Sequence, residues 1–311
     1  MARVQQSAVQ STGTHMKRVP SLTLRGISEA GRDLRLGQRR EAKMAATSSK
    51  LEFAVQMSCE SCANTVRSAL TGVNGIQSVD IDVSTEQVLI DTTLTSREVQ
   101  ELIESTGRRA VLKGMGPSTL KDLGAAVAML GPEGNIKGAV RFLQLSEKMC
   151  LIEGTVDGLK PGQHGLHVHE FGDLTNSCLS CGDHYNPGEN RHGGPQDVDR
   201  HVGDLGNIRA SEDGRATFRM EDDRIKVSDI IGRSLVIDSG EDDLGKGSHP
   251  LSKVTGNSGE RLACGIIARS AGLFQNPKRI CSCDGVTLWE ERDRPIAGTG
   301  RKSQDPPTAN L

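Results

Sequence analysis

Cysteine is the residue type in this 311-residue chain whose spacing most strongly suggests chemistry. Eight cysteines are too few for a disulfide scaffold of this length, but six of them occur as closely spaced pairs. Such pairs are typical of metal binding or thiol exchange. The pairs are Cys59 with Cys62, Cys178 with Cys181, and Cys281 with Cys283, whereas Cys150 and Cys264 stand alone.

Cys59 and Cys62 lie three residues apart at the expected start of a helix. A helix N-terminus lowers the pKa of a thiol and so favours the thiolate that binds metal. Soft thiolates select Cu(I) or Zn(II), and two sulfurs suffice for Cu(I) but leave tetrahedral zinc underfilled. We therefore predict an open Cu(I) site that can pass its ion on. The alternatives are a redox pair and two ordinary buried cysteines, and Met57 is expected to pack in the loop rather than bind the ion.

Five of the eight histidines fall between residues 167 and 201. His167 and His169 are two residues apart on an expected strand, so both rings point to one face. Three further histidines and an aspartate follow on a long loop rich in Gly and Pro, and three imidazoles with one carboxylate are a suitable tetrahedral zinc set. Solvated loop histidines are the alternative. The predicted zinc ligands are His184, His192, His201 and Asp204.

Cys281 and Cys283 belong to a polar segment near the end of the chain. In an extended segment, side chains two residues apart point to the same side, so both thiols can meet one target. A disulfide between such near neighbours is strained and exchanges readily. This pair therefore suits capture of Cu(I), attack on another protein's thiol, or both, with chance clustering of cysteines as the alternative.

The elements that must position the first thiol pair alternate between strand and helix patterns. Thr95 and Glu98 form a capping box at the start of the second expected helix, and Gly107 ends it. This order predicts a small ferredoxin-like β-α-β-β-α-β sandwich. Its expected elements are strand 51–57, helix 63–73, strands 79–83 and 88–90, helix 95–107 and strand 109–113, followed by a linker at 114–117.

The histidines lie in a second region, where short apolar runs are separated by Gly, Asp and Asn turns. Helical periodicity is lost there, so we predict an antiparallel Greek-key barrel or sandwich. The fold class is therefore multidomain, α+β and then all-β, with a flexible C-terminal tail. The apolar runs are 125–130, 139–145, 150–156, 166–168, 216–220, 234–237 and 262–267.

Charge and composition complete the division of the chain. Residues 1–43 hold nine Lys or Arg against three Asp or Glu, a net of +6, so the rest carries −8 and the total is −2. This balance argues against a general nucleic-acid binder, and no apolar run approaches the ~18 residues of a membrane span. The basic segment suggests a disordered extension, a transit-like peptide, or sequence upstream of a true start at Met44. We expect four parts: an extension 1–49, a metal-binding domain 50–115, a barrel domain 118–270 and a tail 271–311.

Both domains resemble known families. The β-α-β-β-α-β unit with its Met57-Ser58-Cys59-Glu60-Ser61-Cys62 run resembles the heavy-metal-associated domains. The barrel region, from about residue 120 to 270, resembles copper/zinc superoxide dismutase. The runs that carry this second resemblance are Gly165-Leu166-His167-Val168-His169-Glu170-Phe171-Gly172-Asp173, His192-Gly193-Gly194-Pro195, Arg200-His201-Val202-Gly203-Asp204-Leu205-Gly206-Asn207 and Arg261-Leu262-Ala263-Cys264-Gly265.

The dismutase resemblance assigns roles and also shows one departure. It implies that His184, His192, His201 and Asp204 hold zinc, that His184 bridges zinc and copper, and that Cys178 pairs with Cys264, with Cys181 as a competitor. Arg261 resembles the arginine that guides superoxide to copper. Asp238, however, stands where the family has a further copper-ligand histidine, which leaves only His167, His169 and His184. A hard carboxylate disfavours Cu(I), so we expect weak or absent dismutase activity.

The order of the three parts resembles the copper chaperones for superoxide dismutase. This resemblance implies that Cys59 and Cys62 carry Cu(I), that the zinc-containing barrel docks an immature dismutase subunit as a heterodimer, and that Cys281 and Cys283 insert copper and form the client's disulfide. It also implies a homodimer without client and an upstream copper donor. The metal-binding thiol pairs fit a reducing cytoplasm, the basic extension is compatible with a share in the mitochondrial intermembrane space, and the nucleus is a further expected compartment. The segment 265–277 is expected to form part of the docking surface. The alternatives are an active dismutase with a fused copper-feeding domain and a copper buffer without a client.

Overall fold

The computed structural model describes residues 47–119, 121–131, 135–277 and 287–291. All of these residues belong to one compact unit of the chain, Ala46–Leu311. The basic extension and the tail thiols Cys281 and Cys283 lie outside the described residues, so what the sequence predicts for them stays a prediction.

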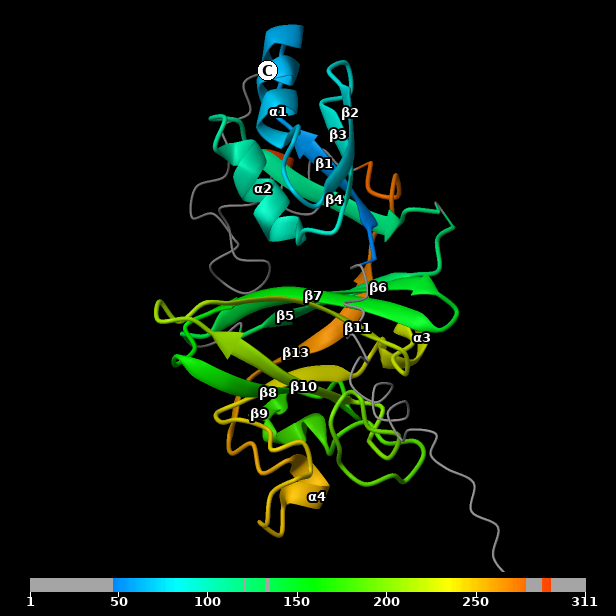
Figure 1. Cartoon of the computed structure of the whole chain (residues 1–311), viewed down its shortest axis with the longest axis vertical. Coiled ribbons are helices and arrows are strands. Elements are labelled where there is room, and N and C mark those ends of the chain that lie inside the picture. The colour runs from blue at the N-terminus through cyan, green and yellow to red at the C-terminus, as the bar shows by residue number, and fades with distance from the viewer. Residues whose placement is uncertain (1–46, 120, 132–134, 278–286, 292–311) are drawn as a thin grey trace, which may run out of the picture. The chain divides into compact units, whose positions relative to one another are not determined.

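The first described region is a four-stranded antiparallel sheet with two helices (Figure 1). Its strands are ordered β2-β3-β1-β4. The β-α-β-β-α-β order predicted from the sequence is confirmed. The elements are β1 (Ser49–Val55), α1 (Glu60–Leu70), β2 (Ile76–Asp82), β3 (Gln87–Thr92), α2 (Ser96–Glu104) and β4 (Ala110–Pro117).

Local sequence signals explain the helices of this domain. The Thr95 hydroxyl accepts a hydrogen bond from the Glu98 amide at 3.2 Å, and the Thr95 amide donates to the Glu98 carboxylate at 2.8 Å, so the predicted capping box is present. Helix α1 buries Ala63, Val66 and Leu70 against the sheet at the spacing of one helical face. The first helix therefore presents its N-terminus, with the thiol pair, at a fixed end of the domain.

The segment 114–117, predicted to be a linker from its Gly and Pro content, is instead the last part of β4. A Cβ atom on Gly114 would lie 2.3 Å from the carbonyl oxygen of Gly272, and one on Gly116 would lie 2.6 Å from a methyl carbon of Leu273. Glycine is required at these strand positions because another part of the chain approaches closely. The glycines of this segment therefore reflect close contact with another part of the chain, not a break between domains.

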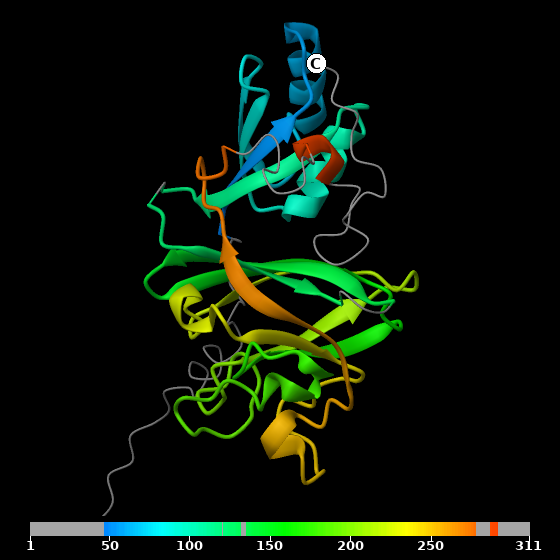
Figure 2. The ribbon, with the colours of Figure 1, turned by 180° about the vertical axis from the view of Figure 1, so that it is seen from behind.

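The second region is a nearly closed antiparallel barrel of eight strands, as predicted (Figures 1 and 2). The strands are ordered β10-β8-β12-β13-β5-β6-β7-β11. Each expected apolar run lies on one strand, whereas β10 begins inside the histidine-rich segment and was not predicted. The strands are β5 (Ala125–Leu130), β6 (Lys137–Ser146), β7 (Met149–Asp157), β8 (Gly162–His169), β10 (Asp204–Ala210), β11 (Ala216–Asp222), β12 (Ser234–Asp238) and β13 (Arg261–Ser270).

Four short elements lie in the barrel region, and a fifth, α5, lies beside β4. They were not predicted because elements of three or four residues are too short to show a periodic pattern. They are β9 (Thr175–Cys178), the 3₁₀ turn η1 (Leu179–Cys181), α3 (Val227–Ile230), α4 (Ser252–Thr255) and α5 (Leu288–Glu291).

The barrel core is built almost wholly from aliphatic side chains. Val140, Ile152, Leu166 and Ile267 are completely buried, and Phe142 is the one large aromatic side chain buried with them. The low aromatic content of the chain is thus compatible with a closely packed core. The core holds β8 and β12 rigidly side by side, which fixes the two strand histidines.

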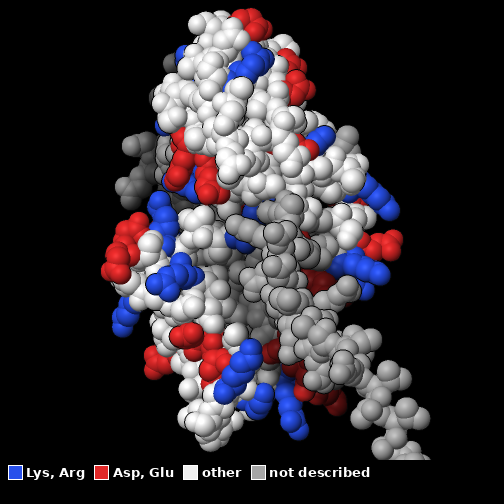
Figure 3. Space-filling model, in the orientation of Figure 1, with Lys and Arg blue, Asp and Glu red and all other residues white. Residues whose placement is uncertain are grey.

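The surface agrees with a chain of nearly neutral net charge. On the face shown in Figure 3, acidic and basic side chains are interspersed. Among the described residues, no helix is long and apolar enough to cross a membrane.

Candidate metal centres

The first candidate centre is the thiol pair at the start of α1. Cys59 is the N-cap residue, and its Sγ lies 3.3 Å from the Sγ of Cys62. Cys59 is exposed, Cys62 is buried, and Met57 is buried in the core of the domain. One ion could therefore contact both sulfurs and still be reached through Cys59.

The pKa of Cys62 is lowered to about 7. The largest cause is a hydrogen bond from the backbone of Ser58, followed by the hydrogen bond with Cys59, while burial acts in the opposite direction. A thiol with this pKa is partly ionised at neutral pH. The pair is therefore prepared to bind a soft cation without a separate base.

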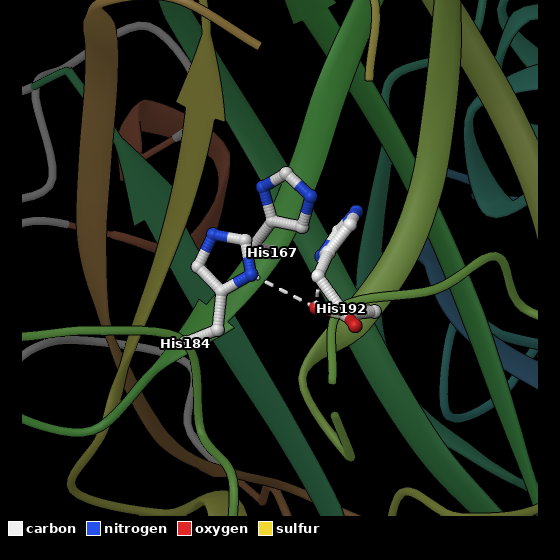
Figure 4. Close-up of side chains that lie close together, drawn as sticks. His167, His184 and His192 are labelled. Atoms are coloured by element: carbon white, nitrogen blue, oxygen red, sulfur yellow. Dashed lines mark hydrogen bonds and ion pairs between the residues drawn. The ribbon is translucent and has the colours of Figure 1, made fainter. Parts of the chain in front are cut away.

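The second candidate centre is a set of three imidazoles around one carboxylate oxygen of Asp204, the first residue of β10. Figure 4 shows two of these imidazoles, His184 and His192, beside His167. Asp204 is completely buried. The distances from its Oδ1 to the Nδ1 atoms of His184, His192 and His201 are 2.8, 3.0 and 3.1 Å. The four predicted zinc ligands thus converge, although 20 residues separate the first from the last.

The donor atoms of this set fit zinc. One carboxylate oxygen cannot accept well-aligned hydrogen bonds from three ring nitrogens. The buried His192 Nδ1 lies 3.0 Å from Asp204 Oδ1 without forming a well-aligned hydrogen bond among the described residues. Three imidazole nitrogens and one carboxylate oxygen are a suitable tetrahedral zinc donor set. A slightly different group, with His167 in place of His201, also has ligand atoms within 4.8 Å of one another. The two groups share His184, His192 and Asp204.

The electrostatics of the cluster follow from burial and from its carboxylates. Burial raises the pKa of Asp204, but hydrogen bonds from the three histidines outweigh burial and hold it far below its usual range. Burial and the nearby His167 lower the pKa of His184 to about 4. For His192, burial lowers the pKa, but the adjacent carboxylates of Asp204 and Asp242 raise it to about 9. The cluster therefore contains an ionised carboxylate at neutral pH, as a metal site requires.

Asp242 is a residue whose role the sequence analysis missed. It is buried, and its two oxygens lie 2.9 Å from His167 Nε2 and 2.8 Å from His192 Nε2. Asp242 thus links His167, in the incomplete copper position, to His192, in the predicted zinc set. The available signal was an acidic residue four positions after Asp238, but sequence spacing alone cannot show which rings such a residue meets.

Asp238 ends β12 next to β8, where the dismutase resemblance expects a copper ligand. Its Oδ2 lies 2.9 Å from His167 Nδ1 and accepts a hydrogen bond from the Ser258 hydroxyl at 2.8 Å. Burial lowers the pKa of His167, but the carboxylates of Asp238 and Asp242 raise it to about 8. Both ring nitrogens of His167 are therefore bonded to carboxylates.

The other two histidines of the incomplete copper position remain close by. The His184 ring stacks on His167 with centroids 4.0 Å apart. His169 Nδ1 lies 3.0 Å from the carbonyl oxygen of Gly182, and burial lowers the pKa of His169 to about 2. The set His167, His169 and His184 thus lacks its fourth imidazole and has its first one engaged with protein carboxylates.

A disulfide joins Cys178, at the end of β9, to Cys264 on β13, with the Cα atoms 5.6 Å apart. This is the pairing that the dismutase resemblance implied. Cys181 is buried beside the bond and is not disulfide-bonded within the described part of the chain. The Arg261 guanidinium donates hydrogen bonds to the carbonyls of Cys178 and Gly182, so it holds the same loop in place.

The remaining singled-out residues lie where structural roles are expected. Cys150 is completely buried in the barrel core, and burial raises its pKa. The two ring nitrogens of His164 lie 2.8 Å from the carbonyl oxygens of Asp238 and Lys160. His249 Nδ1 accepts a hydrogen bond from the Leu251 amide. The geometry thus brings neither His164 nor His249 into a metal cluster.

Two family descriptions match this chain in the two regions described above. Residues 52–109 match the heavy-metal-associated domain, and residues 136–267 match copper/zinc superoxide dismutase (SODC). The human copper chaperone for superoxide dismutase is 68% identical over 261 residues, which cover 84% of this chain and 95% of that protein. The chain belongs to the family of copper chaperones for superoxide dismutase.

Other members of this family span a wide range of organisms. The mouse copper chaperone for superoxide dismutase is 69% identical over the same share of both chains. The Arabidopsis thaliana protein named as the chloroplastic/cytosolic chaperone is 38% identical; the matched residues cover 77% of this chain and 69% of that protein.

Among solved structures, a crystal structure of the clock protein EA4 is 43% identical with a TM-score of 0.46, covering 48% of this chain and 96% of that one.

Proposed function

We propose that this chain delivers Cu(I) to copper/zinc superoxide dismutase and promotes formation of the client's intrasubunit disulfide. One observation carries the proposal. An intact two-thiolate site lies in the same chain as a dismutase-like barrel whose His167 is bonded to Asp238 and Asp242 instead of being free for copper. A protein with this combination can carry copper but lacks the ligands to use it in catalysis.

The first step is capture of Cu(I), the cargo, by Cys59 and Cys62. The lowered pKa of Cys62 supplies a thiolate near neutral pH, and the exposed Cys59 gives an incoming or outgoing thiol access to the ion. An open site with two sulfurs can accept a third sulfur from a partner, so the ion need never be released into water. The same geometry allows loading by an upstream copper donor. Thiols that must stay reduced favour a cytoplasmic location. The basic segment 1–43 supports the proposal of a further share in the mitochondrial intermembrane space, and we also propose a share in the nucleus.

The second step is docking of the client on the barrel. His184, His192, His201 and Asp204 would hold zinc, which supplies a structural centre that ties the long loop to β10. Next to this loop, the outward face of β13 carries Ile266, 43% exposed, together with Ala268. An uncharged strand face of this kind suits contact with another barrel.

The loop after β8 extends this apolar surface. The side chain of Phe171 is 55% exposed. A Cβ atom on Gly172 would lie 2.2 Å from the carbonyl oxygen of Gly232, whose amide donates to Ile267 on β13. A cavity of about 620 Å³ beside the disulfide is lined by Leu174, Leu262 and Cys264, among others. We infer that a dismutase subunit binds here as a heterodimer and that a second copy of this chain binds here without client.

The third step is transfer by Cys281 and Cys283. In their disulfide form these residues can be attacked by one client thiolate, which gives a mixed disulfide and one free tail thiol. The second client thiolate then displaces the tail sulfur, so the client's two thiols are oxidised to a disulfide and the tail is reduced to two thiols. In the reduced form, the same two thiols can receive Cu(I).

The carrier role is tested with limiting Cu(I) and reduced, zinc-bound apo-dismutase as the client. The double variant Cys59→Ser, Cys62→Ser is expected to lose activation of the client, because no other described cysteine pair is both reduced and partly exposed. Its zinc content should be unchanged. Activation at the rate of the unmodified chain would exclude the carrier role.

The second candidate function is an active dismutase with a fused copper-feeding domain. The observation in its favour is the retention of His167, His169 and His184 close together. The rate of superoxide dismutation by the purified chain, loaded with copper and zinc, discriminates between the two functions. A rate near that of a true dismutase would support the enzyme. A copper buffer without a client would leave the retained barrel without a role.

A further inference from the structure

The chain that leaves β13 does not end at the barrel. It continues past Ser270 toward the small sheet and runs beside β4 (Figure 2). Its next residues contact the copper-binding domain at Glu52, Gly114 and Gly116. These contacts are unexpected for the beginning of a tail that the sequence predicts to be flexible.

Glu52 is a buried carboxylate on β1 that receives the tail. Its side chain is 1% exposed, and its Oε2 accepts a hydrogen bond from the Phe274 amide at 2.6 Å. The Oε1 atom accepts from Gln87 Nε2 at 2.7 Å and lies 3.4 Å from Lys113 Nζ. A buried carboxylate requires such partners, and one of them comes from the tail.

Two strand glycines complete this contact. The backbone of Gly272 and the side chain of Leu273 occupy the positions where Cβ atoms of Gly114 and Gly116 would lie. Phe274 adopts a φ of +61°, a region that a bulky residue rarely enters, while its side chain is 58% exposed. The local structure is therefore held by backbone contacts with Glu52 and Gly114 rather than by the phenyl ring.

A second contact lies beyond the two tail cysteines. Helix α5 lies next to β4, and its Leu288 is 6% exposed. Arg109 directly precedes β4, and its guanidinium donates a hydrogen bond to the carbonyl of Trp289 at 3.4 Å. The chain thus returns to the copper-binding domain after the segment 278–286, which contains both tail cysteines.

We propose that Gly272–Gln275 and α5 form a two-point anchor that fastens the tail to the copper-binding domain, with Glu52 and Gly114 as its receiving residues. The anchor holds both ends of the segment that carries Cys281 and Cys283 on the domain that carries Cys59 and Cys62. Linkage of this kind gives an effective concentration on the order of millimolar between the two thiol pairs. The contact itself is independent of copper, while its role in copper hand-over rests on the function proposed above.

The anchor is tested by hydrogen exchange of the amides of residues 272–276 in the full, copper-free chain. In the unmodified chain these amides are expected to exchange at least about tenfold more slowly than in an unstructured peptide. Gly114→Val and Glu52→Ala should each remove this protection, the first by steric conflict with Gly272 and the second by loss of the acceptor. Amides of β1 and β3 serve as the internal check that the domain is still folded.

Matched variants separate the anchor from general effects on the domain. Phe274→Gly should keep the protection, because glycine accepts the positive φ and the exposed phenyl ring is not used. Lys113→Met removes an ion pair of Glu52 but leaves the Phe274 contact, so it should also keep the protection. Leu288→Asp should release residues 287–291 only.

Two results would overturn the anchor. One is exchange of 272–276 at the rate of an unstructured peptide in the unmodified chain. The other is unchanged protection in both Gly114→Val and Glu52→Ala. Because the measurement uses neither copper nor client, failure of copper delivery with the anchor intact would count against the proposed function alone.

Discussion

At the scale of single residues, Asp238 separates this barrel from a working dismutase in two ways. It replaces an imidazole by a hard carboxylate, and it also engages His167 through Nδ1 while Asp242 engages Nε2. The sequence showed the first effect, because it depends only on residue type. The second depends on which atoms meet across β8 and β12, which no spacing rule specifies.

The thiol pair gives a prediction at this scale. Because the pKa of Cys62 is lowered to about 7, its reactive thiolate should predominate above that pH instead of above the ordinary value of 9. Alkylation of the reduced, metal-free chain, followed residue by residue by mass spectrometry, should therefore show a midpoint near 7 at Cys62. Ser58→Pro, which removes the backbone donor, should move the midpoint upward, and a midpoint near 9 in the unmodified chain would contradict the assignment.

Asp204 gives a second prediction. It is the completely buried carboxylate on which three histidines converge, so Asp204→Ala removes a zinc ligand and leaves those histidines without their anion. We expect loss of zinc from the barrel and a decrease of about 3–5 kcal/mol in its free energy of unfolding, measured by metal analysis and urea denaturation. Glu212→Ala, at an exposed acidic residue of the turn after β10, is the control and should change neither quantity. Retention of zinc by Asp204→Ala would refute the ligand set.

At the scale of elements, the small domain could be predicted and the loops of the barrel could not. Alternation in 51–57 and the capping box at Thr95 are local signals, and β1 and α2 follow them. Strand β10 starts at Asp204, a predicted zinc ligand, and includes Gly206, so its pattern resembles a loop. Strand β4 extends through two glycines because Gly272 and Leu273 lie against them, and such a long-range contact leaves no signal in the local sequence.

The disulfide gives a prediction at the scale of elements. It closes a separation of 86 residues, which the chain-entropy model values at about 4.5 kcal/mol. Cys264→Ser should lower the free energy of unfolding of the barrel by about this amount in urea titrations under non-reducing conditions. Cys178→Ser should have a similar effect, because Cys181 is not part of the bond. A smaller loss in Cys178→Ser, with a bond from Cys181 to Cys264 detected by mass spectrometry, would show that Cys181 can take over.

At the scale of the whole molecule, the chain combines a copper-binding domain with a barrel that keeps the dismutase framework. The framework is retained in the eight-stranded sheet, the disulfide and the histidine cluster, while the copper position has lost an imidazole. Recognition of another dismutase subunit is a reason to keep such a barrel without its catalysis. The apolar outward face of β13 is the described surface that best fits this role.

The docking surface gives a prediction at this scale. Ile266→Asp places a charge on the outward face of β13, and burying an unpaired carboxylate in an interface is costly. We expect affinity for the apo-dismutase client to fall by about tenfold or more, measured by sedimentation of the heterodimer. Val198→Asp, which places the same charge at a side chain that is 89% exposed and lies outside β13, is the matched control and should bind normally. Equal binding by both variants would place the interface elsewhere.

The most direct test of copper delivery mixes the Cu(I)-loaded chain with reduced, zinc-bound apo-dismutase and follows client activity and client disulfide in one sample. The account predicts that both appear together with the unmodified chain and with Cys150→Ala, and that both are lost in the double variant Cys281→Ser, Cys283→Ser. Unimpaired activation and disulfide formation by that double variant would contradict it.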